Sequence, residues 1–586
     1  MLKLSIIASI VSVVMAIPAW AESQNSGEIF RAMRDEMQRA TVSLTTDEAE
    51  PPYFIAYKID DSVRQSVTAT RGSLLTENVA HFRLLSIELR IGDYQFDSTN
   101  FYSGLGSSGG IRVTVPISVD DNYAGIRHQL WLATDELYKA ALKNYAEKKA
   151  INATSGNSDL LPDFTRESVH NIEDIHAPID ITIGDLKKIA MGVSNSIANV
   201  DKLDSSQVDL QLIHKTTYFL NSEGTSYTRT QPALHYFATA GIQADDGRVL
   251  QDFDSLHLRN KNDLPSTKIL SERLNTLSKR LINLTQAPLL ESAYVGPVLF
   301  EDQAAAELVL QTLAPNLIAP RISLIANPII RRRQQGNLTR SFSARLNNRI
   351  LPRAFTIIDN PHLDRVDDIP LFANYRVDDE GVASREHTLV EQGQFAKLLG
   401  TRIPGLGHEK STGSMRGGIP TPSNLLLTST DTVTAEALRN ELLTLIKSQN
   451  RDYGLIVRRL SNPRFDPVQS QSTTNLFAQQ QIVVGSPISV YKLFANGKEE
   501  LVRNTEIQNF DMGVYRDILL AGDRPIAYSA PFSLNANQMV SQRYAVTRQL
   551  SELSIASVVT PSLLFEEMSI ATQLKEPEPL PDYPAP

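Results

Sequence analysis

Three stretches in the first half of the chain carry hydrophobic residues at the spacing of an amphipathic helix. They cover residues 29–37, 126–150 and 270–284. The last of these ends at the Gln-Ala-Pro sequence of residues 286–288, which breaks a helix. The pattern therefore predicts three helices before residue 290.

Between these helices, hydrophobic and polar residues alternate, as expected for β-strands. β-Branched and aromatic residues gather at 53–59, 65–70 and 83–91, and alternation resumes over residues 207–249. Turn sequences at 221–224 and 245–247 divide this last stretch. A hairpin array is predicted there.

The second half opens with a predicted strand at 296–300 and a predicted helix at 301–313. Short strands and turns follow from residue 355, with one further helix at 435–447. Strands and helices do not alternate regularly, so the fold class is α+β rather than a doubly wound sheet. We expect an N-terminal α+β domain at 22–289, a β-rich C-terminal domain at 290–574 and a proline-rich tail at 575–586.

The N-terminus has the features of a secretory signal peptide. One lysine, Lys3, precedes an apolar run that ends in Ala19-Trp20-Ala21, which predicts a signal peptide at 1–21 cleaved before Glu22. The run is shorter than the roughly 20 residues needed to cross a bilayer. The mature protein is expected to be periplasmic or secreted, with no membrane span.

Composition narrows the classes of function. The chain has 586 residues, no cysteine and a formal net charge of −9. Disulfides are therefore impossible, and stability has to come from packed cores. A mildly acidic chain without long basic runs argues against a nucleic acid as partner.

Four short segments lie close together in the second half of the chain: 351–359 (LPRAFTIID), 375–381 (YRVDDEG), 389–393 (LVEQG) and 411–416 (STGSMR). Three more are found towards the ends: 51–57 (PPYFIAY), 130–136 (LWLATDE) and 561–567 (PSLLFEE). In these segments the chain resembles the TldD/PmbA family of metallopeptidase-related proteins. The likeness covers most of the mature chain and implies a two-domain TldD/PmbA-like architecture.

The resemblance also implies where a zinc site would lie. Active members of the TldD branch bind zinc through His-Glu-x-x-x-His on the helix that follows the first strand of the C-terminal half, together with a cysteine. Here that helix is residues 301–313, and no histidine occurs between His257 and His362. We therefore expect no metal and no other cofactor. Glu307 and Gln311, one turn apart, either mark a remnant of the site or belong to a solvated helix face.

Other groups of residues offer weaker alternatives for a metal. They are His408-Glu409, the group His170, Glu173, Asp174 and His176, and the group Asp359, His362, Asp364, Asp367 and Asp368. His408-Glu409 has no second histidine at the spacing a zinc helix needs. For the other two groups, scattered loop residues explain the pattern better. The Gly-x-Ser-x-Gly pattern occurs only at residues 106–110, in a glycine- and serine-rich stretch without the strand-to-helix setting of a nucleophile elbow, so it does not indicate a serine hydrolase.

The resemblance implies that the protein binds peptides. In the family, a zinc-bearing subunit pairs with a similar subunit that lacks the motif, and the pair encloses a cavity for peptides. Gly413 and Arg416 are candidates for peptide binding, since a guanidinium can hold a carboxylate or a carbonyl, although a plain turn with a surface arginine explains them as well.

The leading hypothesis is an exported, zinc-free subunit that binds peptides or acts as a scaffold in a homodimer or a heterodimer with a TldD-like chain. Whether the chain is an enzyme stays open. One alternative is an active metallopeptidase with a relocated or inter-subunit metal site, and another is an exported protein that binds a small ligand.

Overall fold

The computed structural model describes residues 27–44, 51–102, 112–155, 161–200, 202–321, 323–325, 327, 329, 332, 342–462, 484–532 and 554–573. The predicted signal peptide and the proline-rich tail lie outside these residues. No helix in the described part of the chain is long and apolar enough to span a bilayer.

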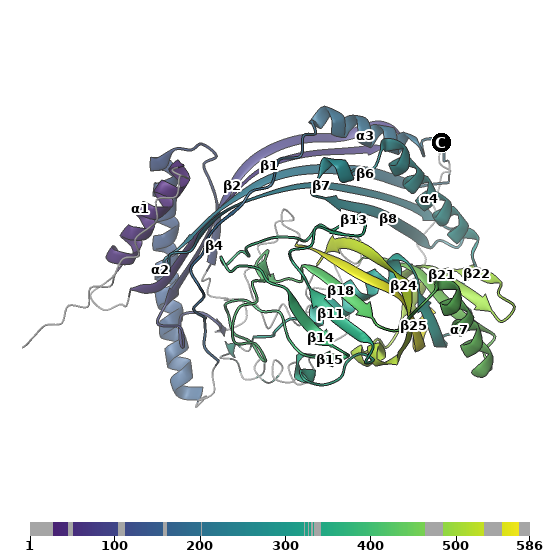
Figure 1. Cartoon of the computed structure of the whole chain (residues 1–586). Coiled ribbons are helices and arrows are strands. Elements are labelled where there is room, and N and C mark those ends of the chain that lie inside the picture. The colour runs from purple at the N-terminus through teal and green to yellow at the C-terminus, as the bar shows by residue number, and fades with distance from the viewer. Residues whose placement is uncertain are drawn as a thin grey trace, which may run out of the picture.

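A long, curved sheet of seven strands arches over the rest of the molecule (Figure 1). Its strands follow the order β4-β2-β1-β6-β7-β5, and β8 also pairs with β7. Their bounds are β1 Pro52–Thr70, β2 Ser73–Ile91, β4 Arg112–Ile117, β5 Asn171–Asp174, β6 Ser205–Asn221, β7 Ser226–Gln243 and β8 Val249–Leu258. The hairpin array predicted over residues 207–249 is confirmed.

β1 is longer than the sequence pattern suggests. The two strands predicted at 53–59 and 65–70 are parts of one strand of 19 residues, paired with β2 from Pro52↔Ile91 to Thr70↔Ser73. The polar stretch between them continues the strand because its side chains have partners on both faces of the sheet. Asp60 accepts a hydrogen bond from Thr217 on one face, and Asp61 pairs with Arg83 on the other.

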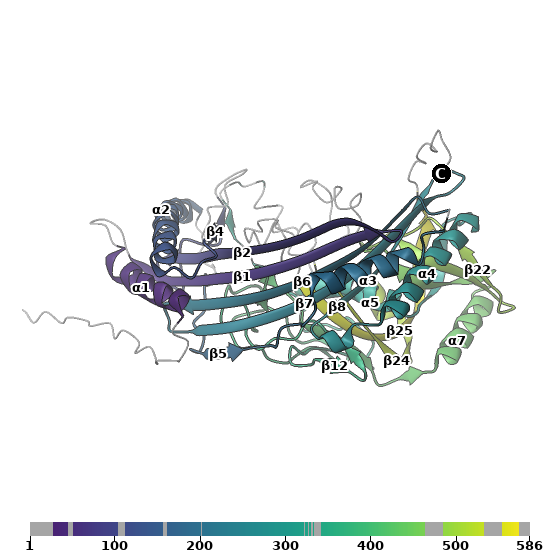
Figure 2. The same ribbon diagram turned by 90° about the horizontal axis from the view of Figure 1, so that it is seen from above.

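Helices cover the outer face of the arch, two at each end (Figures 1 and 2). α1 Glu28–Ser43 and α2 Tyr123–Ser155 pack on one end, and α3 Ile183–Asn195 and α4 Thr267–Gln286 pack on the other. The three predicted helices are confirmed, whereas α3 was not predicted. Its signals are the Thr182 capping box and the buried residues Leu186, Ala190 and Val193.

A second sheet of twelve strands lies under the arch, built from the second half of the chain (Figure 1). Its main path is β15-β14-β11-β18-β25-β9-β20-β21-β22. β23 and β24 also pair with β25, and β19 pairs with β24. Their bounds are β9 Tyr294–Phe300, β11 Phe355–Asp359, β14 His387–Glu391, β15 Gln394–Phe395, β18 Asn424–Ser429, β19 Thr432–Val433, β20 Tyr453–Leu460, β21 Pro487–Phe494, β22 Glu499–Val502, β23 Thr505–Ile507, β24 Ile518–Pro531 and β25 Ile555–Thr572.

Short ribbons and helices complete the structure. The ribbons pair β3 Phe101–Tyr102 with β10 Leu324–Ile325, β12 Arg365–Val366 with β13 Ile369–Pro370, and β16 Met415–Arg416 with β17 Ile419–Pro420. The helices are α5 Gln303–Leu308, extended by a π-helical turn over Val309–Leu313, and α7 Ala435–Ser448. The α+β fold class is thus confirmed, while the domain boundary at 289/290 stays a prediction.

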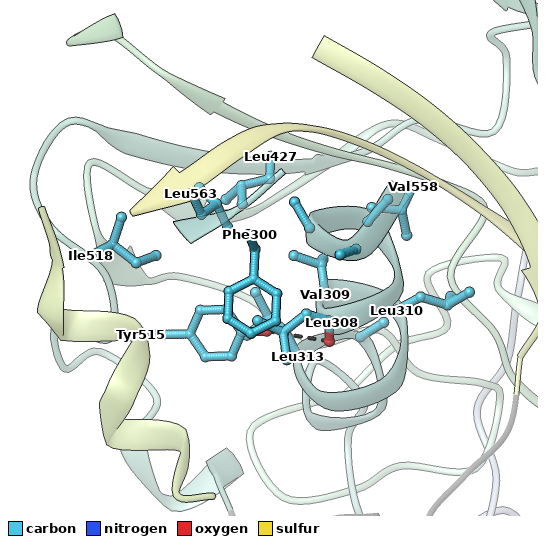
Figure 3. Packing of buried hydrophobic residues seen from close by; sticks show 14 of the residues in the cluster. Phe300, Leu308, Val309, Leu310, Leu313, Leu427, Tyr515, Ile518, Val558 and Leu563 are labelled. Carbon is cyan, nitrogen blue, oxygen red and sulfur yellow. Dashed lines mark hydrogen bonds between the residues drawn. The ribbon is translucent and has the colours of Figure 1, made fainter. Parts of the chain in front are cut away.

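The largest core lies between α5 and the second sheet. Phe300, at the end of β9, is fully buried, and its ring contacts Phe565 of β25 at a centroid distance of 5.5 Å. Figure 3 shows the same ring beside Tyr515 and Leu313. This core fixes α5 in the middle of the C-terminal half.

We expect Phe300→Ala to lower the free energy of unfolding by about 3–5 kcal/mol, because the truncation leaves a cavity that the neighbours only partly fill. Chemical denaturation followed by circular dichroism measures the loss. Leu519→Ala is the control, since Leu519 of β24 is 39% exposed. A loss for Phe300→Ala no larger than that of the control would contradict the role of this core.

Candidate functional site

The helix that the resemblance connects with zinc is α5, and its polar side chains bind the ends of two strands. Glu307 Oε2 accepts a hydrogen bond from the Leu460 amide at 2.5 Å, and Glu307 Oε1 accepts one from Gln303 at 2.6 Å. Gln311 donates to the Ser461 carbonyl at 2.9 Å and accepts from the Gly485 amide at 2.7 Å. Glu307 and Gln311 therefore tie the helix to the end of β20 and the approach to β21.

A solvated helix face does not explain Glu307, because the residue is 0% exposed. Burial raises the pKa of Glu307 to about 7, against the opposing effect of the Arg459 guanidinium. Arg459 also donates to Gln303 Oε1 at 2.9 Å and to the Phe253 carbonyl at 2.6 Å. These hydrogen bonds connect α5 to β8 of the arch.

The remaining side chains of α5 do not fit a zinc ion. Ala304, Ala305, Ala306, Leu308 and Val309 are all buried in the largest core. Zinc needs imidazole, thiolate or carboxylate ligands with an open approach, and this face of the helix supplies methyl groups in close packing. In the described part of the chain, no group of three or more histidine, aspartate or glutamate side chains is arranged to hold a metal.

Gly413 and Arg416, the candidates for peptide binding, lie in the C-terminal half. Gly413 has a positive φ of 72°, and a Cβ atom there would lie 2.6 Å from the Ala383 carbonyl oxygen, so only glycine fits. Its own carbonyl accepts a hydrogen bond from Tyr375 at 2.8 Å. The Arg416 guanidinium lies 4.9 Å from the centre of the Tyr375 ring and donates to the Pro422 carbonyl.

Residues 372–379 join this region to the inner face of the arch. Arg229 of β7 donates to the Val377 carbonyl at 2.7 Å and pairs with Asp379 at 2.6 Å. Lys58 of β1 lies 3.9 Å from Asp379. Burial opposes ionisation of Asp379, but Lys58 and Arg229 hold its pKa below the usual range. The segment is thus fixed to the sheet by a buried ion pair.

Arg259, which directly follows β8, contacts the other end of this segment. It donates to the Phe372 carbonyl at 3.1 Å and lies 4.0 Å from the centre of the Phe372 ring. Sequence analysis missed Arg229 and Arg259, because they are distant in sequence from Arg416. The sequence offered only a weak signal for these two residues: Arg229 lies inside the predicted hairpin array, and Arg259 lies shortly after it.

The group around His170 does not converge. Asp174 is buried and bonds to His176 at 3.3 Å and to the Arg376 amide, whereas Glu173 is exposed. Both acids belong to the extended strand β5, whose neighbouring side chains point to opposite faces.

The group around Asp359 is also divided. Asp359 is buried, accepts a hydrogen bond from the Ser423 amide at 2.6 Å, and has a pKa raised to about 7 by burial. The other members of this group are exposed: His362, Asp364, Asp367 and Asp368. His408 is buried against Gly400, while Glu409 is exposed. The structure brings none of these groups together as a set of metal ligands.

The raised pKa of Glu307 makes stability depend on pH. The folded protein keeps a proton that the unfolded chain releases above its ordinary pKa of 4.5, so the free energy of unfolding falls as pH rises from about 4.5 to about 7. We expect Glu307→Gln to gain stability relative to the wild type between pH 5 and pH 8, by up to about 3 kcal/mol.

Thermal and chemical unfolding at the two pH values measure this difference. Glu567→Gln is the control, because Glu567 is exposed on β25 and should show no such gain. A stability difference between Glu307→Gln and wild type that does not change with pH would contradict the raised pKa.

Comparisons with known proteins agree with this architecture. Residues 293–572 match the family described as PmbA/TldA metallopeptidase C-terminal domain. No curated protein gives a significant match. The fold is similar to a proposed modulator of a DNA gyrase from Thermotoga maritima, with a TM-score of 0.54 and 14% identity over 88% of this chain and 96% of that one.

Two further solved structures have the same fold. TldE from Thermococcus kodakarensis has a TM-score of 0.55 and 14% identity over 92% of this chain and 100% of that one. A proposed modulator of DNA gyrase from Bacteroides thetaiotaomicron has a TM-score of 0.57 and 13% identity over 93% and 98%. Residues 293–572 therefore form a C-terminal domain of the PmbA/TldA metallopeptidase family, and the solved structures share the fold over nearly the whole chain.

Proposed function

We propose that the protein is an exported, zinc-free subunit of a TldD/PmbA peptidase-type complex, in which it binds peptides or acts as a scaffold. One observation carries the proposal. The helix that bears the zinc ligands in active members has alanine, leucine and valine packed into the core here, and its buried glutamate holds strand ends. A chain of this kind contributes a surface to the complex, and a partner contributes the chemistry.

Peptide binding is supported by two features of the described residues. The sheet under the arch ends at β22, whose outer edge has no described strand beside it and suits the addition of an extended peptide. At the other end, β15 is already hydrogen-bonded to residues 347–349. The segment from Gly413 to Arg416 adds a half-buried guanidinium between the sheet and the arch. A guanidinium recognises carbonyl and carboxylate oxygens without regard to peptide sequence.

A dimer follows from the same proposal. The partner is a second copy of this chain or a TldD-like chain that carries the complete His-Glu-x-x-x-His motif. A heterodimer would restore peptidase activity, because the partner supplies the metal that α5 cannot hold.

The first test is metal content. Elemental analysis of the protein, purified without chelators and again after incubation with zinc, should give far less than one zinc per chain, and Glu307→Gln should not change the result. Stoichiometric zinc in the wild type would refute the zinc-free proposal and favour the alternative of an active metallopeptidase with a relocated site.

The second test concerns export. Mass spectrometry of the protein from a periplasmic or culture-medium fraction should give a mature N-terminus at Glu22, because the Ala19-Trp20-Ala21 sequence fits signal peptidase. An intact Met1 on a chain that stays in the cytoplasm would contradict the proposed location.

A further inference from the structure

Three arginines from different parts of the chain contact one short segment, residues 372–379. Arg259 contacts Phe372, Arg416 lies against Tyr375, and Arg229 binds Val377 and Asp379. We call Arg229, Arg259 and Arg416 the arginine cluster. The segment holds the three guanidiniums close enough for Arg229 and Arg416 to lower the pKa of Arg259.

The charges of the arginine cluster are balanced only in part. Asp379 pairs with Arg229 at 2.6 Å and also accepts a hydrogen bond from the Gly417 amide at 2.8 Å. Neither Arg259 nor Arg416 has a carboxylate within salt-bridge distance among the described residues. The acids that act on these two arginines already have other partners. Asp359 bonds to the Ser423 amide and has a pKa raised to about 7 by burial, Asp379 pairs with Arg229, and Asp174, which acts on Arg259, bonds to His176. The cluster therefore carries surplus positive charge.

A buried cationic surplus is costly unless something compensates it. Burial lowers the pKa of Arg259 to about 9 and also lowers the pKa of Arg416, yet both side chains keep part of their surface exposed. The Nε atoms of Arg229 and Arg416 are buried without a hydrogen-bond partner in the described structure. Arg259 and Arg416 are thus partly exposed, and Arg229 and Arg416 each keep an Nε donor that no described residue accepts.

The surroundings of Arg259 are apolar. Ala233, Phe372 and Ile555 form a small buried cluster with Ile213 packed against it, and Arg259 lies over the ring of the same Phe372. Arg259 Nε and Nη1 donate to the Phe372 and Pro232 carbonyls at 3.1 Å each, which holds the guanidinium over the ring and leaves Nη2 to donate to a carboxylate. A charged donor next to an apolar wall is the arrangement that fits the last residue of a peptide.

We propose that Arg259 and Arg416, positioned by residues 372–379 and backed by Arg229, bind the C-terminal carboxylate of a peptide that ends in an apolar residue. This inference rests on the proposed function, because it identifies which end of the peptide is held. The carboxylate would supply the negative charge that the cluster lacks.

The test compares two fluorescently labelled, unstructured peptides that end in leucine, one with a free carboxylate and one with a C-terminal amide. Fluorescence anisotropy with the full mature chain should show the free acid binding about 10- to 100-fold more tightly, as expected for hydrogen bonds to a charged group. This comparison uses the wild-type protein, so it does not depend on the folding of a variant.

Substitutions then locate the site. Arg259→Gln and Arg416→Gln should each weaken binding of the free acid towards that of the amide and leave binding of the amide unchanged. Arg524→Gln, at an exposed arginine on β24, is the matched control and should preserve the preference. Equal affinities before and after Arg259→Gln and Arg416→Gln would overturn the assignment.

The outcomes separate the inference from the proposed function. If acid and amide bind equally well, the carboxylate site is refuted while peptide binding stands. If neither peptide binds, peptide binding itself fails and the inference fails with it. If inorganic phosphate displaces the free acid at a lower concentration than acetate does, the cluster is a phosphate site and the carboxylate assignment is wrong.

Discussion

The structure depends on how the two faces of the arched sheet are covered. Helices cover the outer face, and the C-terminal half of the chain covers the inner face. On the outer face, apolar residues such as Tyr57 and Leu212 pack under the four helices. On the inner face, Lys58, Asp60 and Arg229 lie on strands that are buried from both sides. Buried charges are stable only when they are paired, so the inner face requires the C-terminal half to supply partners and cover.

The ion pair between Arg229 and Asp379 supplies a partner for a buried charge of the inner face, and it also positions a segment of the C-terminal half. By holding Asp379 against the sheet, it fixes residues 372–379 across the space between the two halves. Tyr375 and Phe372 are then placed under the guanidiniums of Arg416 and Arg259. A contact that stabilises the fold therefore also arranges the donors that we assign to peptide recognition.

The helix α5 is part of the largest core and carries one buried carboxyl group. Its small and aliphatic side chains pack in the core that surrounds Phe300. Glu307 remains as a buried carboxyl group whose hydrogen bonds all stay within the protein. Its raised pKa follows from desolvation, which costs stability at neutral pH and is tolerated because Leu460 and Gln303 bind it.

The sequence alone determined the class of fold and the family, since hydrophobic periodicity and the seven family-like segments depend on local order along the chain. It also determined that α5 lacks histidine and that no thiolate exists. The continuity of β1 through Asp60 and the burial of Glu307 depended on partners from other parts of the chain, such as Thr217 and Leu460. Only the tertiary structure could bring Arg229, Arg259 and Arg416 onto one segment, because these arginines are far apart in the sequence. Which of them pairs with a carboxylate depends on contacts between distant residues.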